Sequence, residues 1–473
     1  MNVFTLAAAP RRARSASALA CVSITVRCFE SFDAAAFLRD EVDALNRVSA
    51  RPDPFSTFAF FETYFRHDEF HPAGAGSGLW FLTAFRGQQL IGYLALRQVT
   101  HRVLGIPVAT LGLLVVHDTD RPHLVARPEH EHEHEVSEAF YAHLFERKKE
   151  WSCLEFAQQD RSSALFPPPV SVGLRGCIVR QWPSLENCTI QVRWASLGEY
   201  FAALPKKYRT NLGRQMRKLL DAGEVELLVS SDPAATPALF ELCLGLEPRS
   251  WKAGAQAGIG RHPERVEYFR ALLDPGQPMR VSIQVLLIDG VPAAGIICGA
   301  FGSSLHALHI VYDQRVSELA PGSAMLLMGM RQAIAGRCAF FNLLSGFGYY
   351  KVRWLAQATP TCVGQIYRVG SLLYWRRLFG DMKRRLWPAR ANDPTQSFNP
   401  VRRDAEAREA GPVARPPWTA EEAARVAALI AQARAGQGEF LSGDALAAVM
   451  PVELRRGAGV RPLRVPAGPA PLP

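Results

Sequence analysis

The chain has 473 residues, of which 48% are hydrophobic and 21% are charged, and its formal net charge is +10. This length predicts two or three globular domains, and no apolar run reaches the ~18 residues that a membrane-spanning helix needs. The nine cysteines are scattered without a paired spacing. Such scatter is typical of reduced cysteines in a cytoplasmic protein and argues against a disulfide framework or a zinc site.

The N-terminal segment carries three arginines ahead of a mildly apolar stretch that serines interrupt. A secretory signal has a cleaner apolar core. We therefore expect residues 1–20 to form a disordered leader.

Hydrophobic periodicity predicts the elements of the first half. Helices are expected at 33–48 with Asp33 as the N-cap, at 54–70 and at 137–151. Strands are expected at 23–29, 78–87, 88–100, 106–116, 153–159 and 176–182. A His/Glu tract at 130–135 invites a metal reading, but low-complexity tracts of this kind are usually polar loop insertions, so we expect no metal site.

The second half repeats the same order of elements. Helices are expected at 196–223, 237–251, 263–273 and 321–336, and strands at 225–230, 279–290, 291–302, 304–313, 338–346 and 361–369. Two copies of one α/β layout predict tandem domains, each with a central mixed sheet flanked by helices. We expect these domains at 21–182 and 183–370, a basic amphipathic helix at 371–390, and a loose Pro/Ala/Arg-rich tail at 391–473 with one helix.

The second half contains one predicted anion site. The strand at 304–313 leads through a short loop into Pro321-Gly322-Ser323, which opens a helix that ends at Gly336. The first N–H groups of a helix lack partners and favour a phosphate or another anion. The alternative is an ordinary strand–helix connection. The first half has the His/Glu insertion at the equivalent place, so we expect no anion site there.

These motifs together resemble the GNAT acyltransferase superfamily. The residues that carry the resemblance are Tyr312-Asp313, Pro321-Gly322-Ser323 and the cluster Tyr350-Lys351…Trp354. More narrowly, the layout over roughly 22–385 is similar to double-GNAT proteins of the cellulose-biosynthesis (CelD) type, which are relatives of the Fem aminoacyltransferases. The usual phosphate loop, (Q/R)xxGx(G/A), keeps one glycine here, in the sequence LAPGSA at 319–324.

The resemblance implies acetyl-CoA or another acyl-CoA as co-substrate, and direct attack of an amine on its thioester. The residues it implies for cofactor binding are Tyr312, Pro321, Gly322, Ser323, Arg209 and Arg214. The residues it implies for catalysis are Asp313, Lys351 and Tyr350, and those for the acceptor site are Trp251, Tyr349 and Trp354. For Asp313, capping of the loop is an equally good alternative to a catalytic role. For Lys351, the alternative is an ordinary position on the surface.

Two basic stretches suggest anionic partners. Residues 206–218 carry six cations and no acid, which suits the 3′-phosphate of CoA, a lipid head group or a tRNA backbone. Nucleic acid is the least expected, because only Tyr208 is interleaved. The helix at 371–388 joins an apolar stripe to many cations, so it either docks on an anionic membrane surface or packs across the core.

We therefore expect a cytoplasmic N-acyltransferase, peripheral at the inner membrane, that modifies an amino sugar or another amine of a cell-envelope or polysaccharide precursor. One alternative is Fem-type transfer from aminoacyl-tRNA. The other is a non-catalytic GNAT-like partner of a polysaccharide synthesis complex.

Overall fold

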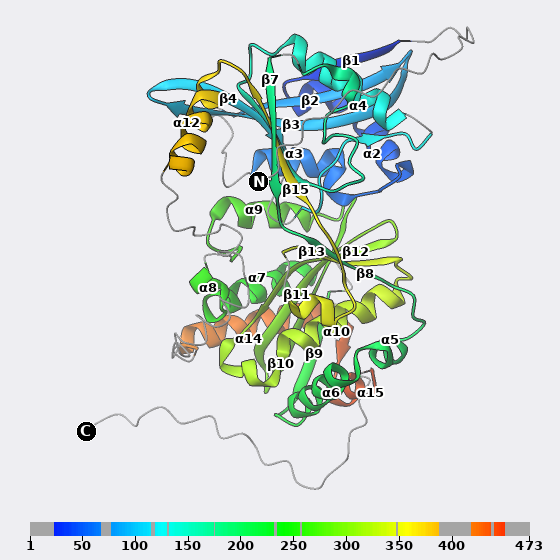
Figure 1. Ribbon diagram of the computed structural model, residues 1–473. Coiled ribbons are helices and arrows are strands. Elements are labelled where there is room, and N and C mark those ends of the chain that lie inside the picture. The colour runs from blue at the N-terminus through cyan, green and yellow to red at the C-terminus, as the bar shows by residue number, and fades with distance from the viewer. Residues whose placement is uncertain are drawn as a thin grey trace.

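The computed structural model describes residues 23–67, 77–114, 119–129, 132–174, 176–230, 234–255, 258–346, 349–386, 418–436 and 439–449. Figure 1 shows two α/β halves, one above the other, each with its own mixed sheet. The predicted fold class, tandem α/β domains with a helical C-terminal segment, is confirmed. The predicted leader, residues 1–20, lies outside the described residues.

The first sheet has the strand order β1-β2-β3-β4-β6-β15-β7, and β5 pairs with β3. Its strands are β1 (Ile24–Phe29), β2 (Ser77–Arg86), β3 (Gln89–Val103), β4 (Ile106–Leu113), β5 (Val125–Ala126), β6 (Cys153–Gln159), β7 (Cys177–Pro183) and β15 (Cys362–Arg368). Gly87 turns β2 into β3 with φ of 63°, a conformation that glycine adopts without strain.

The second sheet has the order β14-β8-β13-β12-β11-β10-β9-β16. Its strands are β8 (Asn187–Gln191), β9 (Val225–Val229), β10 (Arg280–Ile288), β11 (Val291–Phe301), β12 (Ser304–Tyr312), β13 (Phe340–Ser345), β14 (Gln357–Thr359) and β16 (Glu439–Leu441). Asp289-Gly290, a dipeptide typical of hairpin turns, joins β10 to β11. Sequence patterns missed β5, β8, β14 and β16, which have only two to five residues each.

One strand of the second half crosses to the first sheet. β15, expected to close the second half, lies in the first sheet between β6 and β7. β8, at the start of the second half, stays in the second sheet between β13 and β14. The expected domain boundary at 182/183 therefore divides the sequence but not the two sheets. The first sheet includes β15 from beyond this boundary, and Ile366 of β15 is fully buried in the first half.

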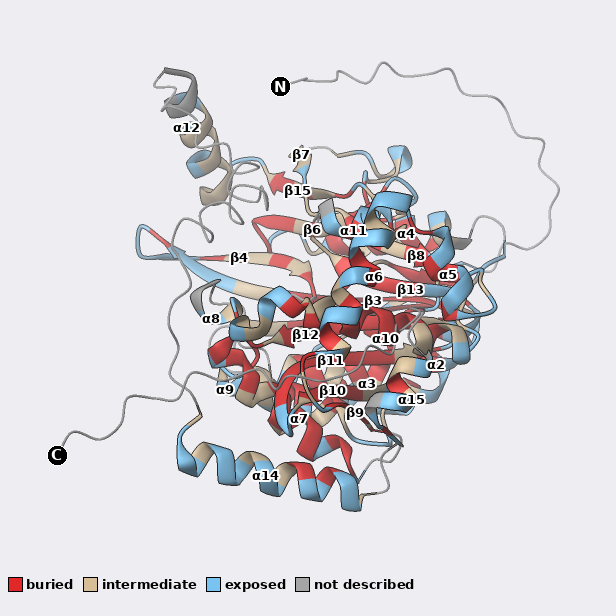
Figure 2. Ribbon diagram, turned by 90° about the horizontal axis from the view of Figure 1, so that it is seen from below, coloured by how far each residue is buried: buried red, intermediate tan, exposed pale blue. Residues whose placement is uncertain are grey.

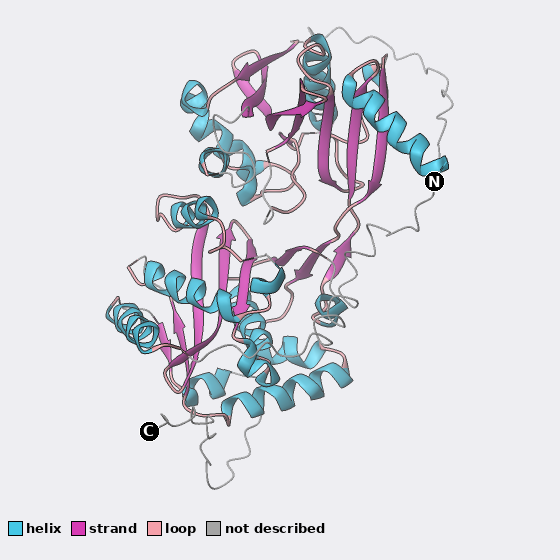
Figure 3. Cartoon of the chain, turned by 90° about the vertical axis from the view of Figure 1, so that its left-hand side faces the viewer, coloured by secondary structure: helices cyan, strands magenta, loops and turns pink. Residues whose placement is uncertain are grey.

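Helices cover both faces of both sheets (Figure 3). In the first half they are α1 (Phe32–Ala35), η1 (Ala36–Leu38), α2 (Arg39–Val48), η2 (Pro54–Ser56), α3 (Phe58–Arg66), α4 (His132–Glu146) and η3 (Val170–Val172). Ser31, rather than the expected Asp33, caps α1 by accepting a hydrogen bond from the Ala34 amide at 3.2 Å. The described part of the His/Glu tract, from His132, forms the first turn of α4 instead of a loop.

The second half has helices on each face of its sheet and a helix that returns to the first half. They are α5 (Leu197–Ala203), α6 (Lys206–Leu220), α7 (Thr236–Leu246), η4 (Glu247–Arg249), α8 (Lys252–Ala255), α9 (Pro263–Leu272), η5 (Gln314–Leu319), α10 (Pro321–Ala335), α11 (Tyr349–Arg353) and α12 (Leu372–Leu386). Side chains of α5, α6 and α10 pack on one face, and those of α7 and α9 pack on the other.

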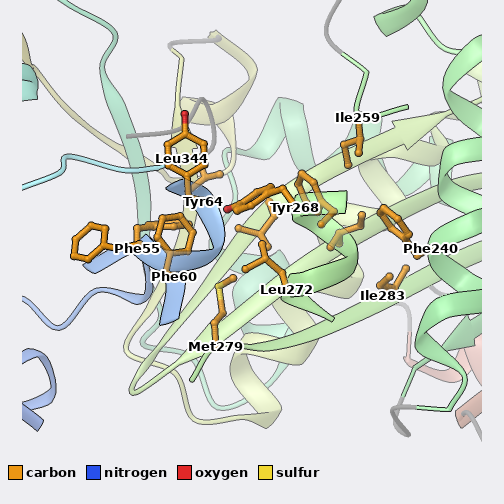
Figure 4. Packing of buried hydrophobic residues seen from close by; sticks show 14 of the residues in the cluster. Phe55, Phe60, Tyr64, Phe240, Ile259, Tyr268, Leu272, Met279, Ile283 and Leu344 are labelled. Atoms are coloured by element: carbon orange, nitrogen blue, oxygen red, sulfur yellow. The ribbon is translucent and has the colours of Figure 1, made fainter. Parts of the chain in front are cut away.

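One hydrophobic core joins the two halves. The face of the second sheet that α7 and α9 cover continues into the aromatic residues of η2 and α3. Figure 4 shows Phe60 and Tyr64 of α3 beside Tyr268 of α9, with ring centroids 6.0 and 5.8 Å from Tyr268. Burial of this kind contributes about 25 cal/mol per Å² of apolar surface, so the interface is a stable part of the fold.

The C-terminal segment packs on the second half where it is described. The helix expected in the tail is α14 (Ala420–Ala435), and β16 and α15 (Gly443–Val449) follow it. Figure 2 shows α14 with both buried and exposed segments. Ile430 and Leu446 are buried, and Arg249 of η4 pairs with Glu422 at 2.8 Å. The expected loose attachment is therefore wrong for residues 418–449, because α14 and β16 bury apolar side chains against α7 and the sheet edge.

No helix within the described ranges is long and apolar enough to cross a membrane. The expected basic helix at 371–390 is α12 over its described part, and Figure 1 shows it beside the first half.

Candidate functional site

The second sheet opens where β12 leaves β13. The two strands are parallel, and their pairing covers only Ser304–His306 opposite Phe340–Asn342. β12 continues to Tyr312 while it stays paired with β11 on its other side. Within the described chain, the edge of β12 beyond His306 therefore has no strand partner, and it presents backbone N–H and C=O groups.

A bulge in β12 sets the direction of the side chains along this edge. Opposite β11, Ile297 faces His309 and Cys298 faces Ala307, so Leu308 is the extra residue. Because a bulge places one additional side chain on a face, Leu308 and His309 both contact residues on the side of α7 and α8. Ala307 packs on the opposite side, toward α10.

The expected anion site lies where the opened edge meets α10. Pro321 is the first residue of this 15-residue helix, and Ala320 before it has φ of 54°. The amides of Ser323 and Ala324 turn back to the Ala320 carbonyl at 2.9 and 3.3 Å. Gly322 lies against Tyr312, since a Cβ there would be 3.1 Å from the Tyr312 ring. The structure thus brings Tyr312, Pro321, Gly322 and Ser323 together.

Asp313 is a loop cap in this structure. It is buried, accepts from the Arg315 amide at 2.9 Å, and pairs with the Arg315 guanidinium at 2.6 Å. Both oxygens of this carboxylate already accept hydrogen bonds from Arg315. The geometry therefore favours the capping alternative.

Lys351 is buried rather than on the surface. Its ammonium donates to the carbonyls of Leu343, Leu344 and Ser345 at 2.8, 3.3 and 3.2 Å. Burial lowers the pKa of this lysine, while Cys188 and Asp120 oppose the shift. Lys351 on α11 therefore holds the end of β13, where Leu344 adopts a φ of 58°.

The aromatic residues expected at the acceptor site have different environments. Trp354 is buried, and its ring centroid lies 5.7 Å from that of Tyr208, so Trp354 belongs to the core. Tyr350 on α11 and Trp251 beside α8 are about half exposed, at 51% and 45%. Tyr349 begins α11.

The basic helix α6 lies next to the loop that precedes α10. Lys218 of α6 pairs with Glu318 of η5 at 2.9 Å. Arg214 is exposed and donates to Asn211 at 2.8 Å, and Arg209 is half-buried and donates to the Ala202 and Leu204 carbonyls. The expected proximity of a cationic face to the anion site is therefore present, although Arg209 is engaged within its own helical hairpin.

A buried group that sequence patterns did not reveal lies on the α8 side of β12. His309 Nε2 is 2.8 Å from Glu247 Oε1, and Lys252 Nζ is 2.9 Å from His309 Nδ1. Glu247 also accepts from the amides of Ile259 and Gly260, each at 2.7 Å. The only signal in the sequence was a histidine within an apolar strand and a glutamate after an apolar helix, and both patterns are common in ordinary cores.

A second buried polar network joins the halves near the start of the opening. Asn342 of β13 donates to Asp120 at 2.7 Å, and Arg51 and Arg121 both pair with Asp160. Burial, with Arg121 nearby, lowers the pKa of His306 on β12 to about 4, although Asp120 opposes the shift. The network fixes the first half against the strands that open.

The first half has a hollow of about 640 Å³ between β3, β4, β6, β15 and α12. Its charged and amide lining residues are Arg97, His101, Arg102, Glu155, Gln365 and Arg376. Gln365 lies at the end of the second half and Arg376 follows that half in the sequence, so the crossing of β15 and α12 lets both parts of the chain line this hollow. Across the described residues, no group of three or more His, Cys, Asp or Glu side chains is arranged to hold a metal ion.

Comparisons with known proteins bear on the second half. Residues 206–352 match the family model described as Acetyltransferase (GNAT) domain. No curated protein matches the chain.

Three solved structures illustrate the similarity in fold. FemX has a TM-score of 0.49 and 10% identity, covering 71% of this chain and 97% of that chain. A conserved protein of unknown function from Bacteroides thetaiotaomicron has a TM-score of 0.43 and 12% identity, covering 72% and 100%. A tandem GNAT protein from the clavulanic acid biosynthesis pathway has a TM-score of 0.42 and 13% identity, covering 74% and 99%. All three TM-scores are below 0.5.

The matched residues include the basic helix α6, the opened edge of β12, the start of α10 and Lys351. The GNAT resemblance is therefore confirmed at the level of the domain, and the narrower likeness to CelD-type proteins stays a prediction. The second half of the chain contains a GNAT acetyltransferase domain, and the protein is an acyltransferase.

Proposed function

We propose that this acyltransferase uses acyl-CoA, with acetyl-CoA as the simplest donor, to acylate an amine on an amino sugar or another cell-envelope or polysaccharide precursor. The observation that supports the donor best is the junction of β12 with α10. Beyond His306, the β12 edge lacks a strand partner in the described chain and leads directly to the start of a 15-residue helix. Such an edge suits the amide-bearing arm of CoA, and the helix start suits its pyrophosphate.

The cations of α6 extend this donor site. Lys218 and Glu318 join α6 to η5, so the exposed Arg214 lies on the helix next to the phosphate end of the site. A 3′-phosphate of CoA would find a cationic surface there. We keep Arg214 as a donor-binding residue of the proposal, and we give Arg209 a supporting role because it donates to carbonyls of α5 and the following turn.

The acceptor reaches the donor from the side of the first half. Trp251 is exposed beside α8, and the first half packs on this same face of the second sheet through the core around Tyr268. Clefts between domains commonly bind ligands. The proposed role of the first half is therefore to shape the acceptor site, without a donor of its own.

Calorimetric titration with acetyl-CoA and with CoA tests the donor assignment. We expect wild type to bind both, Gly322→Asp to lose at least 10-fold in affinity, and Gly322→Ala to lose less than about threefold. Both substitutions press on Tyr312, because a Cβ at Gly322 lies 3.1 Å from its ring, but only aspartate adds a negative charge where the pyrophosphate approaches. Equal binding by wild type and Gly322→Asp would show that the site is misplaced.

Failure of the wild type to bind either ligand would contradict the acyl-CoA proposal. Transfer from aminoacyl-tRNA, or a non-catalytic role in a polysaccharide synthesis complex, would then be the better explanation. A titration with aminoacyl-tRNA separates these two.

The exposed face of α12 supports a location at an anionic membrane surface. Trp375, Phe379 and Met382 are 44%, 59% and 45% exposed on one side of this helix. Asp381 pairs with Arg180 of β7 at 3.0 Å, so the polar side of α12 faces the protein. A helix that turns aromatic residues outward and carries cations suits a bilayer interface.

A further inference from the structure

Glu247, His309 and Lys252 form a closely packed polar group next to the loop at 258–260. Glu247 and His309 are 5% and 4% exposed. The loop at 258–260 wraps the Glu247 carboxylate so closely that a Cβ at Gly258 would be 2.7 Å from Oε2. Three donors, the His309 ring and the Ile259 and Gly260 amides, hold this carboxylate in place. Such fixation leaves the imidazole one orientation.

The contact with Glu247 indicates the tautomer of His309. An ionised carboxylate only accepts, so Nε2, which is 2.8 Å from Glu247 Oε1, carries the ring proton of the neutral imidazole. The lone pair is then on Nδ1. The Lys252 ammonium is 2.9 Å from Nδ1 and 3.3 Å from Nε2, so it lies beside the ring and not along this lone pair.

The charges around the ring maintain this state. Burial, Lys252 and Arg265 of α9 lower the pKa of His309 to about 4, while Glu247 raises it. Burial raises the pKa of Glu247, but the bonds from His309, Gly260 and Ile259 outweigh it, and the net shift is downward. Cys243 of α7 also faces Glu247. The result is an ionised carboxylate, a neutral imidazole and an ammonium in a row.

The position of His309 matches that of a base in the proposed reaction. It lies on the β12 edge, three residues before Tyr312 and three after the last pair with β13. At about 3.3 Å per residue, His309 is about 10 Å along the strand from Tyr312. A donor arm that runs back along β12 from the start of α10 therefore passes it, and the exposed Trp251 is adjacent to Lys252 in the chain.

We propose that His309, oriented by Glu247, is the general base for the acceptor amine, and that Lys252 occupies the place of this amine in the free enzyme. This inference rests on the proposed function. The acceptor enters as an ammonium, displaces the Lys252 ammonium from beside the ring and gives one proton to Nδ1 of His309. The neutral amine then attacks the thioester, so the C–N bond forms and the C–S bond breaks. The second amine proton goes with the departing thiolate to give CoA thiol, and His309 releases its proton to water.

The test uses the whole chain with acetyl-CoA and a panel of primary amines that includes glucosamine, and it follows release of CoA thiol. General bases contribute typically 10²–10⁴-fold, so we expect His309→Gln to lose about 100-fold or more in rate and to bind acetyl-CoA as wild type does. His143→Gln, a half-buried histidine on α4, is the matched control and should keep the full rate. If His309→Gln stays within about threefold of wild type, the base assignment is wrong.

A second variant separates a base from a structural ion cluster. Lys252→Met removes the competing ammonium, so we expect a lower KM for the amine with kcat little changed. Loss of this cation raises the pKa of His309, so the acid limb of the kcat/KM profile should move to higher pH. Lys149→Met, exposed after α4, should change neither. A purely structural role would lower the melting temperature and leave the pH profile in place, which would overturn the proposal.

The outcomes also separate this inference from the proposed function. Wild type that fails to bind acetyl-CoA, or that binds it but releases no thiol with any amine in the panel, contradicts the proposed function itself. Wild type that releases thiol with an amine, while His309→Gln does so at an unchanged rate, contradicts the base assignment alone. Imidazole added to His309→Ala should restore part of the rate, since a small base can enter the space left by the ring, and failure of this rescue with acetyl-CoA bound counts against the proposal.

Discussion

Asn342 of β13 donates to Asp120 of the first half across 2.7 Å, and the same side-chain amide accepts from Asn187 at 3.1 Å and from the Leu344 amide at 2.8 Å. One residue therefore connects the first half, strand β8 and the unusual turn at Leu344. Asn342 and Asp120 are both buried, so water cannot replace this hydrogen bond when one partner is changed.

Replacing Asn342 with aspartate should destabilise the protein strongly. The change keeps the shape but replaces the amide donor with a second carboxylate. Loss of a hydrogen bond to a charged group costs about 1.5–3 kcal/mol, and the repulsion between two buried carboxylates adds to it. The repulsion raises the pKa of one carboxyl, so the loss should be smaller at pH 5 than at pH 8, where both groups are ionised. Chemical denaturation at the two pH values measures this. Asn211→Asp, exposed on α6, should change stability by less than about 0.5 kcal/mol.

Lys351→Met should lower stability as well as activity. A purely catalytic Lys351, as the resemblance implies, would give a loss of transfer with near-normal melting, but the ammonium holds three carbonyls at the end of β13. Hydrogen bonds from a charged donor contribute about 1.5–3 kcal/mol, and buried carbonyls left without partners add to the cost. We expect a loss of about 3 kcal/mol by denaturant unfolding, against no change for Lys149→Met. Normal melting with lost transfer would instead return Lys351 to substrate binding.

Asp53 should make stability fall as pH rises toward neutrality. Burial is the main cause that raises its pKa to about 7, and Asp120 adds to it while Arg51 and bonds from Phe55 and Ser56 oppose it. The folded protein therefore holds a proton that the unfolded chain, with a pKa near 4, gives up. This stabilisation is complete below about pH 4 and is lost through pH 7, by about 4 kcal/mol in all.

The comparison of wild type with Asp53→Asn isolates this effect. Asparagine keeps an acceptor for the Phe55 amide, which now bonds Asp53 at 3.2 Å, but it does not titrate. We expect the stability of the variant relative to wild type to increase steadily as the pH rises from 4 to 7. Thermal or urea unfolding measures this difference. A constant difference over this range would show that Asp53 is ionised throughout.

Binding to lipid vesicles should depend on α12 and on salt. We expect flotation with anionic vesicles at low salt, less at high salt, and little with neutral vesicles, because each cation near an anionic surface contributes about 1 kcal/mol that salt screens. Trp375→Ser with Phe379→Ser should abolish flotation. Leu104→Ser with Val170→Ser removes two residues that are 89% and 95% exposed elsewhere, and should not. Equal recovery on neutral vesicles would argue that the helix packs against protein instead.

The first half alone should not fold. A fragment of residues 1–183 lacks β15, which pairs with β6 and β7 and buries Ile366. It would expose the edges of both strands, and unpaired edges favour aggregation. We expect the fragment to be insoluble or to lack a cooperative unfolding transition. A soluble fragment with a sharp transition would mean that β15 is dispensable to the first sheet.

The sequence by itself determined most of the elements and their class. Alternating and 3.6-residue periodicity placed the long strands and helices, Pro321 and Gly336 marked α10, and Asp289-Gly290 marked a hairpin, because these signals depend on the local backbone alone. The repeat of one order in two halves was enough to predict tandem α/β domains. Strands of two to five residues, such as β8 and β14, were too short to show a period.

Tertiary structure alone decided the partners. The side chains of a strand alternate with the same period whichever sheet the strand joins. The sequence of residues 362–368 therefore could not predict that β15 joins the first sheet. His309 and Glu247 lie 62 positions apart and meet only because β12 packs beside the end of α7. Tertiary contacts likewise determined the environments of three residues expected in the site. Asp313 pairs with Arg315, Lys351 donates to three carbonyls of β13, and Trp354 packs on Tyr208. Burial and pairing are properties of the packed chain and not of its local sequence.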